Sequence, residues 1–301
     1  MKNLHRKIKK ISKYCLLFLI CSVMCSCENK SVIDEVRYGD NSKVGQYLDV
    51  DNSQIYFETY GNNSNQPLIL IHGNSGSIAA MALQIDFFKE DYFVIVADNR
   101  THGKSGDANV LTYDLMARDY IAILDFLKID SSYVLGQSDG GIIGLIMAMN
   151  FPNRIKKLVS AVPNILTGEE AIASWELELG KNHRKLIDSM LVVNDKSRDW
   201  KREKIHVELM KNYPNIEFTE LSQIKCPVLV VTSDDDIIKP RHILQIYENI
   251  PNAQLFVMPG ATHFMIRDEY ELFNMMTNRF LSKPFTRPRS KEVLMEMIGL
   301  N

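Results

Sequence analysis

Short, mainly apolar runs alternate with segments of helical periodicity along most of this chain. Such runs are typical of parallel strands buried on both faces, and their alternation with helices predicts an α/β fold with a mostly parallel, doubly wound central sheet. The carboxyl ends of the strands should then form the working edge of the sheet. The runs occupy residues 68–71, 92–97, 133–135, 157–162, 228–233 and 255–258, and helical patterns occupy 78–89, 112–127, 142–149 and 265–281.

Two departures from this alternation suggest the domain boundaries. Residues 44–50 and 54–60 alternate between apolar and polar positions on either side of residues 51–53, which predicts a hairpin at the start of the domain. Residues 164–220 carry charged, helical sequence in place of strands, so we expect a helical insertion there. The expected parts are a sheet domain at 44–163 and 221–282, inserted helices at 169–179, 185–192 and 201–211, and a tail at 283–301 without an assigned function.

The first 43 residues differ from the rest. A basic start is followed by ten uncharged residues at 15–24, a run that is too short to cross a bilayer and has the form of a secretory signal. Cys27 follows Ser26, which resembles a bacterial lipoprotein signal, where the cysteine is lipidated and becomes the new N-terminus. We therefore expect a signal peptide at 1–26, a tether at 27–43, and attachment of the exported protein to a cell-envelope membrane through Cys27. Modification of Cys25, a plainly cleaved signal giving a secreted or periplasmic protein, and an uncleaved anchor stay open as alternatives.

Charge and cysteine usage narrow the function classes. The formal net charge of the 301 residues is −2, but from residue 27 onward 29 basic residues stand against 37 acidic ones. A body this acidic argues against nucleic acid as a partner. Four of the five cysteines lie in the leader, so Cys226 has no disulfide partner within the body and is expected to be a buried thiol.

One segment has the pattern of a nucleophile elbow, the sharp strand-to-helix turn that presents a catalytic residue. The sequence Gly136-Gln137-Ser138-Asp139-Gly140 follows the run at 133–135 and opens the helical pattern at 142–149. In such a turn the serine backbone is strained, and the flanking positions must be nearly free of side chain. Ser138 is therefore our candidate nucleophile.

Two further strand ends could supply the partners of this serine. His263 follows the last strand on a glycine-containing loop and could take the Ser138 proton. The strand ending at residue 233 is followed by Asp234, Asp235 and Asp236, and one of these carboxylates could orient the imidazole. The spacing from the strand and the apolar residues that follow favour Asp236, with Asp234 as the second choice.

The turn after residue 71 offers an oxyanion hole, the pair of donors that stabilises developing negative charge on a carbonyl oxygen. We expect the backbone N–H groups of Asn74 and Asp139 to be these donors. No metal site and no organic cofactor is expected.

Most of the other histidines have structural explanations. His72 and His102 lie in turns, where we expect them to hold loops by hydrogen bonds. His183, His206 and His242 lie on helical patterns and are expected at the surface.

With these motifs in place, residues 44–282 resemble the α/β-hydrolase family. The resemblance implies that Ser138, Asp236 and His263 act as nucleophile, acid and base, and that the insertion at 164–220 forms a small cap over the active site. Thr101 stands where the family commonly has glycine, and Ser233 replaces the glycine usual before the acid. The matching elements are His72-Gly73, Asp98-x-Arg100-x-x-Gly103-x-Ser105, Gly136-x-Ser138-x-Gly140, the acidic turn ending at Asp236, and Gly260-x-x-His263.

Within the family, Gly-x-Ser-Asp-Gly-Gly followed by Ile-x-x-Leu-Ile is most similar to the biphenyl-hydrolase-like (valacyclovir hydrolase) branch, which cleaves amino-acid esters. In that branch the acidic residue beside the nucleophile helps to bind the substrate's ammonium group, so the resemblance implies that substrate-binding role for Asp139. Stabilisation of a carboxylate by the helix dipole is the competing explanation for this residue.

The expected protein is thus a carboxylesterase-like serine hydrolase that cleaves a small ester, with an aminoacyl ester as one candidate, through an acyl-enzyme. Its expected partner is a small-molecule ester or amide. A proline-iminopeptidase-like peptidase and an acyltransferase remain alternatives. A non-catalytic ligand-binding lipoprotein on the same fold is a hypothesis from another class.

Overall fold

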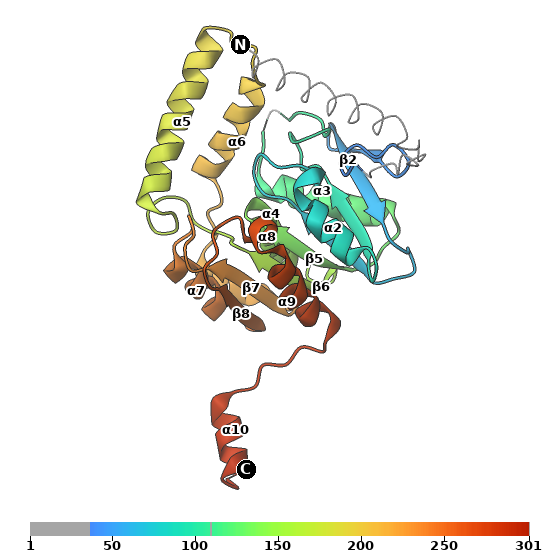
Figure 1. The fold of residues 1–301 in the computed structure, drawn as a ribbon, viewed down its shortest axis with the longest axis vertical. Helices are drawn as coiled ribbons and strands as arrows, with labels where there is room; N and C mark the ends of the chain where they lie inside the picture. The colour runs from blue at the N-terminus through green and yellow to red at the C-terminus, as the bar shows by residue number, and fades with distance from the viewer. Residues whose placement is uncertain (1–36, 109, 301) are drawn as a thin grey trace, which may run out of the picture. The chain divides into compact units, whose positions relative to one another are not determined.

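The computed structural model describes residues 37–108 and 110–300, so the expected signal peptide, Cys27 and most of the expected tether lie outside the described residues. An eight-stranded sheet with the order β1-β2-β4-β3-β5-β6-β7-β8 forms the centre (Figure 1). The β1–β2 and β2–β4 pairs are antiparallel and all other neighbouring pairs are parallel, which confirms the predicted sheet. The strands are β1 (Gln46–Val50), β2 (Ser53–Tyr60), β3 (Pro67–Ile71), β4 (Phe93–Ala97), β5 (Ser132–Gln137), β6 (Ile155–Ala161), β7 (Val228–Ser233) and β8 (Ala253–Met258).

Helices cover both faces of this sheet. Because successive strand residues point to opposite faces, a single strand contributes side chains to two separate buried clusters. Ile69 and Ile71 of β3 pack in one buried cluster with α3, α4 and α7, whereas Leu68 and Leu70 pack in another with η1, α2 and α9. These helices are η1 (Ile78–Met81), α2 (Ala82–Phe88), α3 (Tyr113–Phe126), α4 (Asp139–Asn150), η2 (Phe218–Gln223), α7 (Pro240–Asn249), α8 (Met265–Asp268) and α9 (Tyr270–Ser282).

The predicted hairpin joins β1 and β2. Asp51 and Asn52 at its tip have φ angles of 44° and 61°. Positive φ at both central residues is the geometry that matches the twist of a two-residue hairpin, and aspartate and asparagine tolerate it better than most residues.

A buried carboxylate on β2 ties the N-terminal residues to the sheet. Glu58 accepts hydrogen bonds from the backbone N–H groups of Gly39 (2.8 Å) and Asn41 (2.9 Å) and from the hydroxyls of Tyr56 and Tyr60 (both 2.7 Å). Four donors satisfy a charge that would otherwise be costly to bury. The body therefore begins before Val44, because residues at the end of the expected tether are held on the sheet.

The insertion at 164–220 contains two helices, α5 (Ser174–Val192) and α6 (Trp200–Asn212), which lie side by side (Figure 1). The two segments expected at 169–179 and 185–192 belong to one continuous helix, α5, which begins only at Ser174. Ile187 of α5 packs with Trp200 and Val207 of α6. Glycine in a helix interior costs about 1 kcal/mol of stability relative to alanine, and the packing between the two helices outweighs this cost at Gly180, so α5 continues through it.

The tail carries a short helix, α10 (Ser290–Met297), with no buried residue.

Across 37–108 and 110–300, no helix combines the length and the apolar character that crossing a membrane would require. Cys226 is buried with a free thiol, as expected.

Candidate active site

The turn after β5 holds Ser138 in a strained conformation. Its φ of 55° and ψ of −119° lie in a region that non-glycine residues rarely adopt. A Cβ on Gly136 would lie 2.0 Å from the Gly140 oxygen, and one on Gly140 would lie 2.2 Å from the Ile71 oxygen. Glycine at both positions therefore lets β3, β5 and α4 approach closely enough to form the turn.

The structure brings Ser138, His263 and Asp236 together at the carboxyl ends of β5, β8 and β7. His263 Nε2 lies 3.0 Å from Ser138 Oγ, and His263 Nδ1 lies 2.8 Å from Asp236 Oδ1. Asp236 is held in turn by the backbone N–H of Ile238 (2.9 Å) and the hydroxyl of Ser233 (3.2 Å). Its side chain is fully buried, so water does not compete for the imidazole.

The neighbouring Asp234 has a different set of contacts. Its carboxylate accepts hydrogen bonds from the backbone N–H groups of Gly260 (2.8 Å) and Ala261 (3.2 Å), and these bonds lower its pKa. It therefore fastens the loop that carries His263 to the end of β7. Of the three adjacent aspartates, Asp236 is the one that contacts the imidazole.

The expected oxyanion donors lie beside Ser138. A Cβ on Gly73, the residue before Asn74, would lie 3.2 Å from Ser138 Cβ, so this turn packs directly against the serine. Asp139 is the first residue of α4, where backbone N–H groups have no partner within the helix. Among the backbone hydrogen bonds that the described residues form outside regular helices and strands, none is donated by Asn74 or Asp139.

The Asp139 side chain connects the elbow to its surroundings. Its Oδ2 accepts a hydrogen bond from Asn74 Nδ2 (2.9 Å), and it also bonds the Tyr113 hydroxyl. The residue is 4% exposed, and burial raises its pKa although both hydrogen bonds lower it. The carboxylate thus fixes the Asn74 turn relative to the nucleophile.

A cavity of about 700 Å³ opens at Ser138 and Asp139, between the elbow and the two inserted helices. Glu176 of α5 is the acidic side chain on its cap wall, and it is half-buried with no ion pair or side-chain hydrogen bond within 37–108 and 110–300. Burial raises the pKa of Glu176. This residue could not be identified from the sequence, because nothing local distinguishes it from the other acidic residues of the insertion. Apolar lining side chains include Leu177, Leu179, Leu186, Val207 and Met210.

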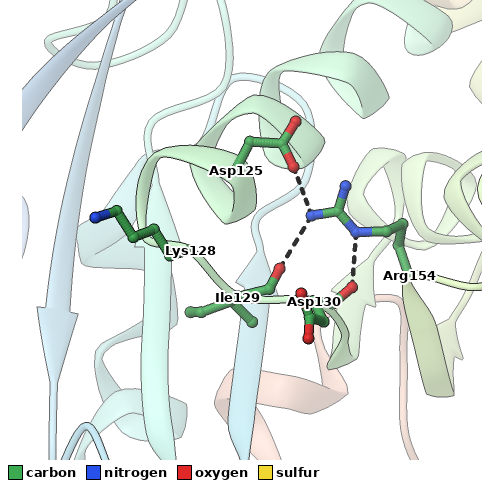
Figure 2. A pocket seen from close by; sticks show the side chains of 5 residues that line it. All are labelled: Asp125, Lys128, Ile129, Asp130 and Arg154. Carbon is green, nitrogen blue, oxygen red and sulfur yellow. Dashed lines mark hydrogen bonds and ion pairs between the residues drawn. The ribbon is translucent and has the colours of Figure 1, made fainter.

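A second hollow lies at the other edge of the sheet, where β5 and β6 begin (Figure 2). Arg154 dominates it, but its guanidinium is already bound by the Ile129 oxygen (3.0 Å), the Asp130 oxygen (2.7 Å) and the Asp125 carboxylate (2.7 Å). These contacts join α3 to the start of β6 and engage Arg154 Nε and Nη2 with the protein itself.

The histidine predictions are partly confirmed. His72 holds a loop as expected, because Nδ1 donates to the Gly73 oxygen (2.8 Å) and Nε2 accepts from Asn99 N–H (3.0 Å). The surface prediction is wrong for His206 and His242, which are 7% and 1% exposed. His242 Nε2 accepts from the backbone N–H of Ile165 (3.0 Å), and His206 stacks on the ring of His102. Their partners are distant in sequence, so helical periodicity did not reveal them.

Known proteins resemble this chain in fold and, more distantly, in sequence. Residues 66–190 match the family model described as alpha/beta hydrolase fold. The chain is 28% identical over 255 residues to a 2-hydroxy-6-oxononadienedioate/2-hydroxy-6-oxononatrienedioate hydrolase of Burkholderia vietnamiensis, covering 73% of this chain and 88% of that protein. It is 24% identical over 245 residues to the human serine hydrolase BPHL, covering 77% of this chain and 84% of that protein.

Among solved structures, the alpha/beta hydrolase enzyme MGS-M2 from a Medee basin deep-sea metagenome library matches with a TM-score of 0.71 and 17% sequence identity. The match covers 81% of this chain and 100% of that one. With the elbow at the end of β5 and the mostly parallel sheet, these likenesses show that the chain has the α/β-hydrolase fold.

Proposed function

We propose that the protein is a serine hydrolase that cleaves a small carboxylic ester through Ser138, His263 and Asp236. The supporting observation is the position of the His263 ring, with Nε2 3.0 Å from Ser138 Oγ and Nδ1 2.8 Å from Asp236 Oδ1. A carboxylate only accepts hydrogen bonds, so Nδ1 carries the ring proton and the Nε2 lone pair faces the serine.

The proposed reaction has two halves. Nε2 of His263 takes the Ser138 proton as Oγ attacks the ester carbonyl carbon, and the oxyanion accepts hydrogen bonds from the N–H groups of Asn74 and Asp139. The C–O bond then breaks, and His263 gives the proton to the leaving alcohol. Water attacks the acyl-enzyme with His263 again as base, which releases the acid and restores Ser138.

A fluorophosphonate probe tests this function. The wild-type protein should be labelled at Ser138 and should hydrolyse activated esters, and Ser138→Ala should lose both properties. Wild-type protein that is neither labelled nor active would contradict the proposal and favour a non-catalytic ligand-binding role. Short acyl, long acyl and aminoacyl esters then report the chain length and charge that the cavity accepts, and a proline anilide tests the peptidase alternative.

The aminoacyl ester is one candidate within this class, and two carboxylates bear on it. The Asp139 carboxylate is engaged by Asn74 and Tyr113, whereas the Glu176 carboxylate, on the cap wall of the cavity, has no such partner among the described residues. We therefore extend the proposed recognition of an ammonium group from Asp139 to Glu176.

An aminoacyl ester and its uncharged acyl analogue separate these contributions. Asp139→Asn and Glu176→Gln should each be compared on both substrates. A residue that binds the ammonium group should, when replaced, lower kcat/KM for the charged ester by more than about tenfold relative to the neutral one. Equal losses on the two esters would remove the recognition role of the residue tested.

Membrane attachment through Cys27 is part of the same proposal, with the alternatives given above. Metabolic labelling with an alkyne fatty acid should mark the wild-type protein. Cys27→Ser should abolish the label, and Cys25→Ser should leave it. The reverse result would assign the modification to Cys25.

A further inference from the structure

A line of contacts leads from α6 of the insertion to the elbow. His206 Nδ1 lies 3.5 Å from Ser75 Oγ, which donates to Asn74 Oδ1 (2.9 Å). Asn74 Nδ2 in turn donates to Asp139 Oδ2 (2.9 Å). The two residues at the end of this line, Asn74 and Asp139, are those whose backbone N–H groups are the expected oxyanion donors.

Further contacts fix the His206 ring. Its Nε2 lies 3.0 Å from the Thr101 oxygen and 3.1 Å from Thr101 Oγ1, and the ring stacks on His102 with centroids 3.9 Å apart and planes at 12°. A carbonyl oxygen only accepts, so Nε2 carries the proton and Nδ1 is an acceptor in the neutral ring. Ser75 has a single hydroxyl proton, which donates either to Asn74 Oδ1 at 2.9 Å or to Nδ1, so with the bond to Asn74 formed the ring holds Ser75 by contact at 3.5 Å. Burial lowers the pKa of His206, which favours that neutral form.

The backbone under this ring is strained. Ser75 and Thr101 have φ angles of 55° and 65°, and a β-branched residue is especially disfavoured there. Such conformations persist only where surrounding contacts hold them, and both residues contact His206. Thr101 stands where α/β-hydrolases commonly have glycine, and its hydroxyl contacts His206 Nε2 of the inserted helix α6.

We propose that His206 is a positioning residue for the oxyanion hole, holding the Asn74–Ser75 turn in place from α6. The inference rests on the proposed function, since it concerns donors to the oxyanion of the ester reaction. The contact between His206 and Ser75 is the longest link of the line, so it is the link most easily lost when the insertion moves. Binding of substrate in the cavity would then be coupled to the geometry of the N–H groups beside Ser138.

Two conservative variants distinguish positioning from anchoring. An asparagine amide can occupy roughly the place of Nδ1, and a glutamine amide that of Nε2. His206→Asn should therefore keep the contact with Ser75 and lose that with Thr101, whereas His206→Gln should do the opposite. We expect His206→Gln to lower kcat by about tenfold with KM within about twofold, because a lost oxyanion donor costs about 10²–10³ and a displaced one less. His206→Asn should retain more of kcat than His206→Gln, although it removes the anchor to Thr101.

An alkyl boronic acid provides a second readout, because its tetrahedral adduct with Ser138 places an oxygen near the expected oxyanion donors. Its inhibition constant should rise in parallel with the loss of kcat. Ser75→Ala should reproduce the effect of His206→Gln, and the double variant should be no worse than either single one. Ser75→Ala also tests the inference if the His206 variants fold poorly. Lys204→Ala on the same helix, which breaks only an ion pair with Asp188 of α5, is the matched control and should change neither readout.

Three results would overturn the inference: wild-type kcat in both His206→Gln and Ser75→Ala, a lower kcat in His206→Asn than in His206→Gln, or additive losses in the double variant. If the wild-type enzyme is active and any of these results is found, the positioning role of His206 is excluded and the proposed ester hydrolysis is not affected. A wild-type protein that fails to hydrolyse esters and is not labelled at Ser138 removes both.

Discussion

Asp234 and Asp236 stand two positions apart after β7 and serve different loops. Asp236→Asn should lower kcat by about 10⁴-fold, because the amide can hold the His263 ring in the wrong tautomer. Asp234→Asn keeps an acceptor oxygen for Gly260 or Ala261 and should cost less than about tenfold. Steady-state kinetics on a neutral ester, with circular dichroism to verify folding, measures both. Equal losses in the two variants would contradict the assignment of distinct roles.

Residues with a local signature could be predicted from the sequence, and residues defined by distant partners could not. The glycines around Ser138 are required by a turn of a few residues, so the pattern identified the candidate nucleophile. His263 and Asp236 follow strand ends, and the sheet brings such ends to one edge. His206 has no local signature, since its contacts with Ser75 and Thr101 are created by the docking of α6.

At the scale of elements, β3 to β7 were predicted to within a few residues because these parallel-sheet strands are largely buried on both faces and therefore mainly apolar. Helices were harder to place. The α5 helix continues through Gly180 because of packing against α6, and its sequence was interpreted as two segments. The α7 helix begins at Pro240, and its Ile243 and Ile246 are buried in the same cluster as α3 and α4.

The wall that α5 contributes to the cavity predicts a size limit for the acyl group. Leu177→Trp adds a large side chain beside Ile172 and Glu176, all of which line the cavity. We expect at least a tenfold lower kcat/KM for octanoyl esters and less than a threefold change for acetyl esters, because only the longer chain needs that space. Hydrolysis of a p-nitrophenyl ester series measures this. A uniform loss at all chain lengths would indicate that the variant disturbs α5 instead.

The junction between β2 and the N-terminal residues predicts a loss of stability without a loss of activity. Glu58→Gln replaces one acceptor oxygen by an NH₂ group facing donors from Gly39, Asn41, Tyr56 and Tyr60, which leaves buried groups unpaired. The free energy of unfolding should fall by about 2–3 kcal/mol in urea titrations.

Limited proteolysis should detect release of residues 37–45 in Glu58→Gln, while kcat stays unchanged because Glu58 contacts no residue of the active site. Lys104→Ala, which breaks an exposed ion pair between Asp40 and the loop after β4, is the control and should change stability by less than about 1 kcal/mol. A comparable loss in the control would show that the ion pair, rather than the buried carboxylate, holds the segment.

For the whole molecule, buried histidines predict the response to acid. Burial lowers the pKa of His72 and His242 to about 4 and that of His102 to about 2. They lie after β3, on α7 and after β4, so their contacts connect separate parts of the fold. The unfolded chain, with histidine pKa values near 6.5, binds protons in a pH range where the folded protein does not. Stability is therefore complete above about pH 6.5 and falls as the pH decreases toward 4.

His242 offers the sharpest test of this acid sensitivity. Its Nε2 accepts from Ile165 N–H and its Nδ1 is buried without a hydrogen-bond partner among the described residues, so a second proton has no acceptor. A shift from 6.5 to about 4 corresponds to about 3 kcal/mol of stability lost on acidification, with a slope of about 1.4 kcal/mol per pH unit. His242→Gln cannot titrate, so it should flatten the dependence of the unfolding free energy on pH between 6 and 4.5 by about that slope, even if the variant is less stable at pH 7. An unaltered slope in His242→Gln would mean that the ring takes up its proton without unfolding, through a local rearrangement where α7 meets the segment after β6.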